Sequence, residues 1–219
     1  MGINIAIDGP AGAGKSTIAK KVAKELSFIY VDTGAMYRAM AFYLLEKGIS
    51  GDENISKACH DADISIRYEN GEQQVILNGK NVTAFLRKEE VGNMASVSSA
   101  NPEVRAHLLK LQRNLAAENN VVMDGRDIGT TILPNAEVKI FLTASAKTRA
   151  NRRYLELTEK GEACDMDEIL KDIIDRDERD MSRAVSPLKQ AEDAVRVDTS
   201  QMNIDEVVNC LRQLILDRI

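Results

Sequence analysis

Nine consecutive residues near the N-terminus have the types and the spacing needed to bind phosphate. The segment GPAGAGKST, residues 9–17, matches the P-loop pattern G-x-x-x-x-G-K-[ST]. Its glycines let successive backbone N–H groups point at one anion, and its lysine and serine can reach phosphate and Mg²⁺. A plain Gly/Ala-rich turn would not need lysine and serine side by side. We therefore expect a nucleotide to bind at Gly9, Pro10, Ala11, Gly12, Ala13, Gly14, Lys15, Ser16 and Thr17.

A carboxylate and a guanidinium follow a second apolar run. Asp124 ends the run 121–123, and Arg126 and Asp127 come directly after it. In P-loop proteins an acid at the end of such a strand holds Mg²⁺, so Ser16 and Asp124 are the expected metal ligands. A polar strand end or a helix N-cap is the alternative for Asp124. Arg126 at this place can grip a phosphate through two parallel N–H bonds.

Three arginines lie close together in a charged helical segment. Arg149, Arg152 and Arg153 are spaced i, i+3 and i+4, which puts them on one side of a helix. A solvated helix face, partly neutralised by Glu156 and Glu159, is the simpler interpretation. The alternative is a lid that closes on a triphosphate and stabilises charge as the phosphoryl group moves. On that second interpretation the expected catalytic residues are Lys15, Arg126, Arg149 and Arg153.

A later segment, RDERDMSR, is dense in charges of both signs. Arg176, Asp180 and Arg183 fall on one helical face at i, i+4 and i+7. Surface ion pairs, each worth little, are one explanation. Two cations for a second phosphate group and a carboxylate for a sugar hydroxyl are the other, and the spacing leaves both open.

Strands and helices alternate along most of the chain, and this alternation must position the polar groups. Short runs of β-branched and aromatic residues predict buried strands at 3–8, 28–31, 121–124, 138–142 and 194–197. An α/β fold follows, in which helices cover a parallel sheet and ligands bind at the carboxyl ends of the strands. The P-loop, Asp32 and Asp124 all fall at such ends.

One segment interrupts the alternation. Residues 64–83 contain two short strands with turn pairs at Asn70-Gly71 and Asn78-Gly79, which predicts a small antiparallel meander. Because hairpins do not belong inside a parallel sheet, we expect this segment to be an insertion.

Composition restricts the class of protein. The chain has 219 residues, 44% of them hydrophobic, and a net charge of −5, which argues mildly against a nucleic-acid partner. Cys59, Cys164 and Cys210 fit neither a disulfide framework nor a metal site. No apolar run approaches the roughly 20 residues that span a bilayer, and the N-terminus runs straight into the first strand. We therefore expect a cytoplasmic monomer without a membrane partner.

Four motifs together resemble bacterial cytidylate kinases, which are P-loop nucleoside monophosphate (NMP) kinases. They are IDGPAGAGKST (7–17), DTGAMYR (32–38), DGRDIG (124–129) and RDERDMSRAVSPL (176–188), and the resemblance covers the whole chain. It implies the three-layer α/β/α fold of P-loop NTPases with an antiparallel β insertion and a short helical lid. It also implies that, with ATP as donor and Mg²⁺, a phosphoryl group is transferred to CMP or dCMP.

The resemblance further implies a domain division and an acceptor site. A single domain, 1–219, would have its core at 1–34, 97–145 and 166–219, an NMP-binding region at about 35–96 and a lid at about 146–165. The family often has Ser where this chain has Thr33, and it varies between Gly and Ser at Ser16. The residues implied to bind CMP are Asp32, Thr33, Arg38, Ser96, Arg105, Arg126, Asp127, Arg176, Asp180 and Arg183.

Other functions remain open from the residues themselves. A P-loop kinase could act on UMP, AMP or a non-nucleotide acceptor such as shikimate. A GTP-binding switch is less favoured, because Ser145-Ala146-Lys147 faintly resembles a guanine-binding S-A-K but no N-K-x-D occurs. A nucleic-acid-binding module is disfavoured by the net charge and the lack of interleaved aromatic residues.

Overall fold

Five parallel strands form the central sheet of the computed structural model, which describes residues 2–219. Neighbouring strands all run parallel, so their carboxyl ends share one edge of the sheet, as the alternation predicts. Across the sheet their order is β2 (Ile29–Asp32), β6 (Val121–Gly125), β1 (Asn4–Asp8), β7 (Val138–Thr143) and β8 (Val195–Asp198). At the shared edge, Asp124 of β6 lies in register with Asp32 on one side and Ile7 on the other.

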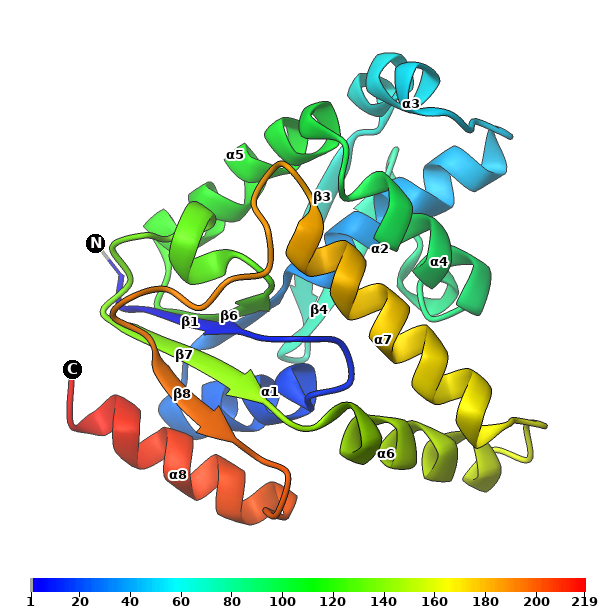
Figure 1. Ribbon diagram of the computed structural model, residues 1–219. Coiled ribbons are helices and arrows are strands. Elements are labelled where there is room, and N and C mark those ends of the chain that lie inside the picture. The colour runs from blue at the N-terminus through cyan, green and yellow to red at the C-terminus, as the bar shows by residue number, and fades with distance from the viewer. Residues whose placement is uncertain (1) are drawn as a thin grey trace.

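Helices cover both faces of this sheet (Figure 1). One face packs on α1 (Lys15–Leu26) and α8 (Ile204–Leu216), and the other on α2 (Thr33–Glu46) and α5 (Pro102–Glu118). Ile5 and Ile7 point to the first face, and Ala6 between them points to the second. Because both faces are buried, the strands are continuous apolar runs and not alternating ones. This arrangement is the predicted α/β/α fold.

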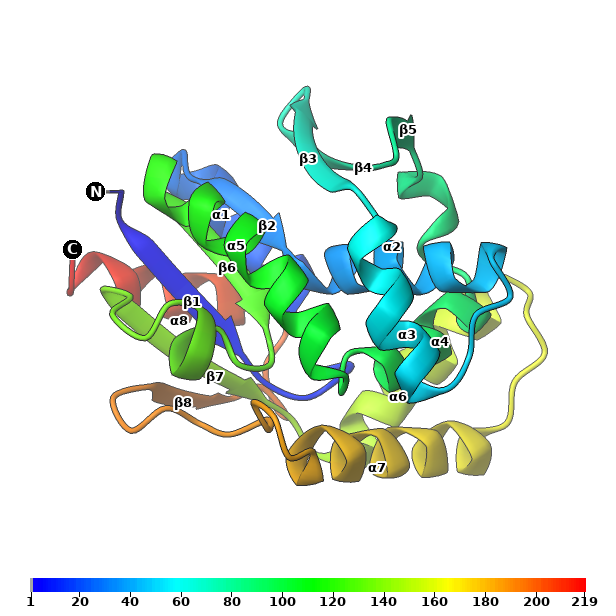
Figure 2. The same ribbon diagram turned by 90° about the horizontal axis from the view of Figure 1, so that it is seen from above.

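The predicted antiparallel meander is confirmed as a separate three-stranded sheet. It consists of β3 (Ile64–Glu69), β4 (Glu72–Leu77) and β5 (Lys80–Asn81). Asn70 and Asn78 have positive φ angles, as the tight hairpin turns require. Figure 2 shows this insertion standing to one side of the central sheet, beyond α2. Around it lie α3 (Asp52–Ala58), η1 (Cys59–Asp61), η2 (Thr83–Phe85) and α4 (Glu89–Ser98).

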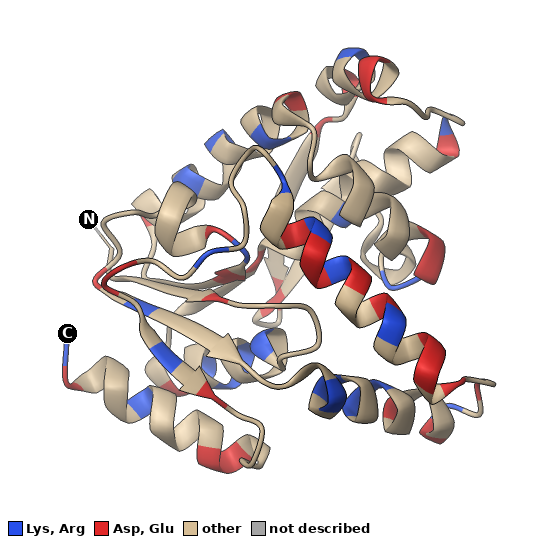
Figure 3. Ribbon diagram, viewed as in Figure 1, with Lys and Arg blue, Asp and Glu red and all other residues tan. Residues whose placement is uncertain are grey.

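Two helices extend past the carboxyl edge of the sheet. They are α6 (Ala146–Glu159) and α7 (Met166–Ser182), and they pack against each other. The segment expected to be a lid comprises α6 and the connection to α7. Figure 3 shows charges of both signs alternating along α7 and basic residues gathered in α6. A one-turn π-helix, η3 (Ile128–Ile132), follows β6. Within residues 2–219, no helix is both long and apolar enough to cross a bilayer.

The apolar stripe of α8 provides a test of the packing. Leu211 is fully buried against the sheet, whereas Leu216 in the same helix is 42% exposed. Replacing a buried leucine with alanine removes apolar contacts and leaves a cavity, so Leu211→Ala is expected to lower the free energy of unfolding by about 3 kcal/mol. The matched control, Leu216→Ala, is expected to change it by less than about 1 kcal/mol. Urea denaturation followed by circular dichroism measures both, and equal losses would contradict this packing.

Candidate active site

The P-loop connects β1 to α1 and has the backbone geometry of an anion cradle. A Cβ atom on Gly9 would lie 1.9 Å from the carbonyl oxygen of Leu142, so only glycine fits there. Gly12 has a φ of 74° and packs against Arg149. Gly14 has no side chain with which to cap α1, which leaves the first N–H groups of the helix directed at the loop.

Lys15 lies buried in this cradle. Its Nζ donates a hydrogen bond to the carbonyl oxygen of Pro10 at 2.8 Å, and 5% of the residue is exposed. Burial and the neighbouring charge of Arg126 lower the pKa of Lys15 to about 7, although Asp124 and Asp8 partly oppose the shift. An anion bound in the loop would favour the charged form of the lysine. The protonation of Lys15 would therefore change when an anion enters the loop.

The carboxylate of Asp124 lies beside the P-loop serine. Ser16 Oγ donates a hydrogen bond to Asp124 Oδ2 at 3.1 Å, and the Tyr30 hydroxyl donates one to Oδ1 at 2.8 Å. Burial and the nearby charge of Asp32 raise the pKa of Asp124 to about 6. Thr33 Oγ1 also donates to the backbone carbonyl of Asp124, at 2.7 Å, which ties the ends of β2 and β6 together. A hydroxyl and a carboxylate thus face each other where the two elements meet.

Five of the residues expected in an acceptor site form one ion-pair network. Arg105 of α5 pairs with Asp127, and both side chains are buried. Arg183 lies 3.6 Å from the other oxygen of Asp127 and 4.0 Å from Asp180. Arg126 Nε donates to Asp180 Oδ2 at 2.9 Å. Although burial alone would raise it, the pKa of Asp180 is lowered by Arg126, Arg176 and Arg183. The network joins α5, the end of β6 and α7.

Two further guanidinium groups lie near this network without a direct ion pair in the part of the chain that the structure describes. Among residues 2–219, no carboxylate lies within salt-bridge distance of Arg38 or Arg176. Arg176 Nε is buried without a hydrogen-bond partner, as are Ser96 Oγ and Arg183 Nη2. Burial and the nearby arginines lower the pKa of Arg176 to about 10. Buried donors without partners are costly, and together they indicate a place for a polar, anionic ligand.

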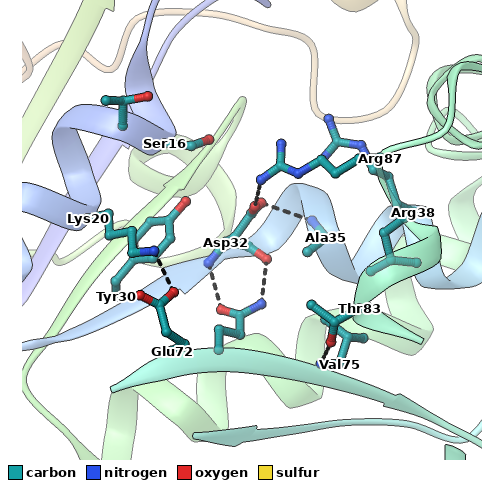
Figure 4. A pocket seen from close by; sticks show the side chains of 13 residues that line it. Ser16, Lys20, Tyr30, Asp32, Ala35, Arg38, Glu72, Val75, Thr83 and Arg87 are labelled. Carbon is teal, nitrogen blue, oxygen red and sulfur yellow. Dashed lines mark hydrogen bonds and ion pairs between the residues drawn. The ribbon is translucent and has the colours of Figure 1, made fainter. Parts of the chain in front are cut away.

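A cavity of about 270 Å³ lies between α1, the end of β2, α2 and the insertion (Figure 4). Asp32 and Arg38 line it and are the only acceptor residues implied by the resemblance that do so within residues 2–219. Asp32 accepts a hydrogen bond from the Ala35 N–H at 2.9 Å, which caps α2, and lies 3.5 Å from Arg87. The cavity is lined by Ser16, Thr17, Lys20, Tyr30, Asp32, Ala35, Arg38, Glu72, Gln73, Val75, Thr83, Leu86 and Arg87.

The three arginines of α6 have three different partners. Arg149 is buried; its Nη1 donates to the P-loop carbonyl of Ala11 at 2.9 Å, and it pairs with Asp177 of α7 at 2.5 Å. Arg152 Nη2 donates to the carbonyl of Thr199 at 2.7 Å. Arg153 pairs with Glu156 at 3.0 Å and is 45% exposed. The structure therefore places Arg149 at the P-loop and Arg153 at the surface.

Several residues that the structure places at the site do not stand out in the sequence. Asp8 accepts the N–H groups of Ile128 and Gly129, at 2.8 Å each, and so holds the loop that carries Asp127. Its position at the end of an apolar strand was an available signal. Tyr30 and Gln73 carried no signal, because an aromatic residue in a strand and a polar residue in a hairpin are both ordinary.

These features together define the class. A P-loop, a strand-end carboxylate and an adjoining arginine-rich site at one edge of a parallel sheet characterise a P-loop phosphotransferase.

Comparisons with known proteins narrow the class to a family. The model of the cytidylate kinase family matches residues 5–217, so the chain belongs to the cytidylate kinase family. It is 50% identical to a cytidylate kinase of Carboxydothermus hydrogenoformans over 97% of both chains. It is also 51% identical to one from Listeria monocytogenes, over 97% of this chain and 95% of the relative. The crystal structure of an uncharacterized protein from Eubacterium ventriosum shares the fold, with a TM-score of 0.52, 14% identity and 99% of each chain covered.

The buried Arg105–Asp127 pair generates a stability prediction. Replacing Arg105 with methionine leaves the Asp127 carboxylate buried without its main partner, since Arg183 compensates only from 3.6 Å. Arg105→Met is expected to lower the free energy of unfolding by about 3 kcal/mol, measured by urea denaturation. The double variant Arg105→Met/Asp127→Asn also removes the unpaired charge of Asp127, so it is expected to recover part of the lost free energy of unfolding. A single-variant loss below about 1 kcal/mol would mean that the pair is solvated.

Proposed function

We propose that this protein transfers the γ-phosphoryl group of ATP to CMP or dCMP, giving ADP and CDP or dCDP. The observation that carries the proposal is that two sets of positively charged and N–H groups lie near one another at one sheet edge. One is the P-loop with Lys15, and the other is the cluster that contains Arg38 and Arg176 without carboxylate partners. Arg126 is close to both, since its charge lowers the pKa of Lys15 and its Nε donates a hydrogen bond to Asp180.

The donor half would hold the phosphates of ATP. The P-loop N–H groups and Lys15 neutralise charge on the triphosphate, and Arg149, anchored at Ala11, lies next to them. Mg²⁺ fits the hydroxyl and carboxylate oxygens of Ser16 and Asp124, which are the hard ligands that it prefers. When bound, the ion would neutralise phosphate charge. No three His, Cys, Asp or Glu side chains gather into a metal site among residues 2–219.

The acceptor half would recognise both ends of CMP. Arg38, Arg126 and Arg183 supply cations for its phosphate, while Arg176 and Asp180 supply a donor and an acceptor for the ribose. The buried Arg105–Asp127 pair beside Ser96 presents a fixed guanidinium and carboxylate to the base. Cytosine has an amino donor where uracil has a carbonyl acceptor, so a carboxylate such as Asp127 favours cytosine and repels uracil.

Catalysis in this arrangement needs positioning more than a strong base. Phosphoryl transfer passes through a loose transition state whose charge is spread over the phosphoryl oxygens. Arg126 and Lys15, near each other at the sheet edge, would stabilise that charge from both halves of the site. Excluding water from the transferring group prevents hydrolysis of ATP, and the insertion and the α6–α7 pair flank the site on two sides. A cytoplasmic monomer without nucleic-acid or membrane partners stays a prediction, as do the domain boundaries.

A substrate panel tests the proposed function. With ATP as donor, ADP release is measured by a coupled assay for CMP, dCMP, UMP, AMP and shikimate. Because a buried carboxylate disfavours a carbonyl acceptor, kcat/KM for CMP and dCMP is expected to exceed that for UMP by at least about tenfold. A preference for AMP or shikimate would replace the proposed acceptor, and turnover of GTP without any acceptor would favour the GTP-binding switch.

Lys15 generates a prediction for pH dependence. Its pKa is lowered to about 7 in the ligand-free protein, so at pH 8 the side chain is mostly neutral. Bound phosphates favour the charged lysine, so ADP binding at pH 8 is expected to take up about one proton, and the affinity is expected to fall from pH 6 to pH 8. Calorimetry in two buffers of different ionisation enthalpy measures this uptake.

Two lysine variants control the pH experiment. Lys15→Met is expected to abolish the proton uptake, because the titrating group is gone. Lys24→Met, at an exposed position in the last turn of the same helix, is expected to leave it unchanged. The same proton uptake in Lys15→Met as in the unmodified protein would assign the titration to another group.

A further inference from the structure

The insertion pairs with the edge strand of the central sheet through side chains. β2 is the outermost strand and bonds only to β6, so the outward backbone groups of Tyr30 and Asp32 lack a neighbouring strand. Gln73 of β4 supplies both partners for Asp32: its Oε1 accepts from the Asp32 N–H at 2.8 Å, and its Nε2 donates to the Asp32 carbonyl at 3.1 Å. The Tyr68 hydroxyl donates to the carbonyl of Tyr30 at 3.0 Å.

The register of the hairpin aims these two side chains together. Tyr68 and Gln73 are cross-strand partners in the β3–β4 pair, so they stand on the same face. Gln74, the next residue, points to the opposite face and accepts a hydrogen bond from Asn81 at 3.1 Å. Glu72, at the hairpin end of β4, separately forms an ion pair with Lys20 of α1. One face of the insertion is therefore built to dock on the end of β2.

Asp32, whose backbone Gln73 holds, lies on the acceptor side of the site. The Asp32 carboxylate caps α2, the helix that carries Arg38, and it lines the cavity with Arg38 and Gln73 (Figure 4). Asp32 also lies in register with Asp124 on β6. Its backbone is thus held by β6 on the inner side and by an amide side chain from the insertion on the outer side. Movement of Gln73 would shift both Asp32 and the start of α2.

We propose that Gln73, assisted by Tyr68, is a positioning residue for the acceptor site. Its amide replaces the missing strand at the end of β2 and keeps Asp32 and the Arg38-bearing helix in the arrangement that binds a nucleoside monophosphate. This proposal rests on the proposed function, because it takes Arg38 and Asp32 to be acceptor-binding groups. The P-loop backbone is anchored by β1 and β7, and its link to β2 runs through Ser16, Asp124 and Tyr30 and not through Gln73.

A pair of neighbouring variants tests the proposal. Gln73→Met keeps the length of the side chain but removes both hydrogen bonds, so the Kd for CMP, measured by calorimetry, is expected to rise about tenfold. The Kd for ADP is expected to stay within about twofold, because the P-loop is untouched. Gln74→Met, on the opposite face, is the matched control and is expected to change neither constant.

Several outcomes would overturn the assignment. The proposal fails if Gln73→Met has a Kd for CMP within twofold of the unmodified protein, or if it binds CMP and ADP more weakly by the same factor. Either result would mean that Gln73 is only a structural contact. If Gln73→Met does not fold, Tyr68→Phe removes only the hydroxyl, and an unchanged Kd for CMP there would equally reject the proposal. If the unmodified protein phosphorylates another monophosphate and not CMP, the proposed function fails, and the same comparison with that acceptor decides the role of Gln73.

Discussion

Buried negative charge at the carboxyl edge of the parallel sheet is the constraint on which the site depends. β1 ends in Asp8 and β2 in Asp32, and β6 carries Asp124 in register with Asp32. Burial raises the pKa of Asp8 and of Asp124 to about 6 each, so their ionised forms need nearby donors. Backbone N–H groups of η3 serve Asp8, and Ser16 and Tyr30 serve Asp124. The P-loop, the loop after β6 and the end of β2 are held together by these bonds.

In the acceptor cluster, too, buried carboxylates are stabilised by nearby donors, which here are the side chains of arginines. Asp127 and Asp180 each lie between arginines, so two carboxylates face the three guanidinium groups of Arg105, Arg126 and Arg183. Buried ion pairs contribute little net stability, but they hold side chains in one geometry, which suits recognition of a base and a sugar. Arg38 and Arg176 stand outside this pairing, and burial lowers the pKa of each.

Two peripheral parts of the chain bring further groups to this edge from opposite sides. The insertion docks on β2 through Gln73 and Tyr68, and the α6–α7 pair reaches the P-loop through Arg149 and Asp177. Each contact uses a side chain to bond backbone atoms that no neighbouring strand or helix serves. The two halves of the site are thus positioned by elements outside the central sheet.

How much could be predicted from the sequence depends on whether a feature is local. The P-loop is nine contiguous residues whose backbone geometry follows from their own types, and the Asn-Gly turns of the insertion are equally local, so both were predicted correctly. The parallel sheet followed from apolar runs that must be buried on both faces. The motifs also identified the family, as the comparisons confirm.

Helical spacing grouped Arg149, Arg152 and Arg153 on one side, but only the tertiary structure separated them into a P-loop contact, a contact to Thr199 and a surface pair. The hydrogen bonds between Gln73 and Asp32 likewise became visible only in the tertiary structure. Contacts between segments some 40 residues apart depend on how the elements pack, and they leave no pattern in the local sequence.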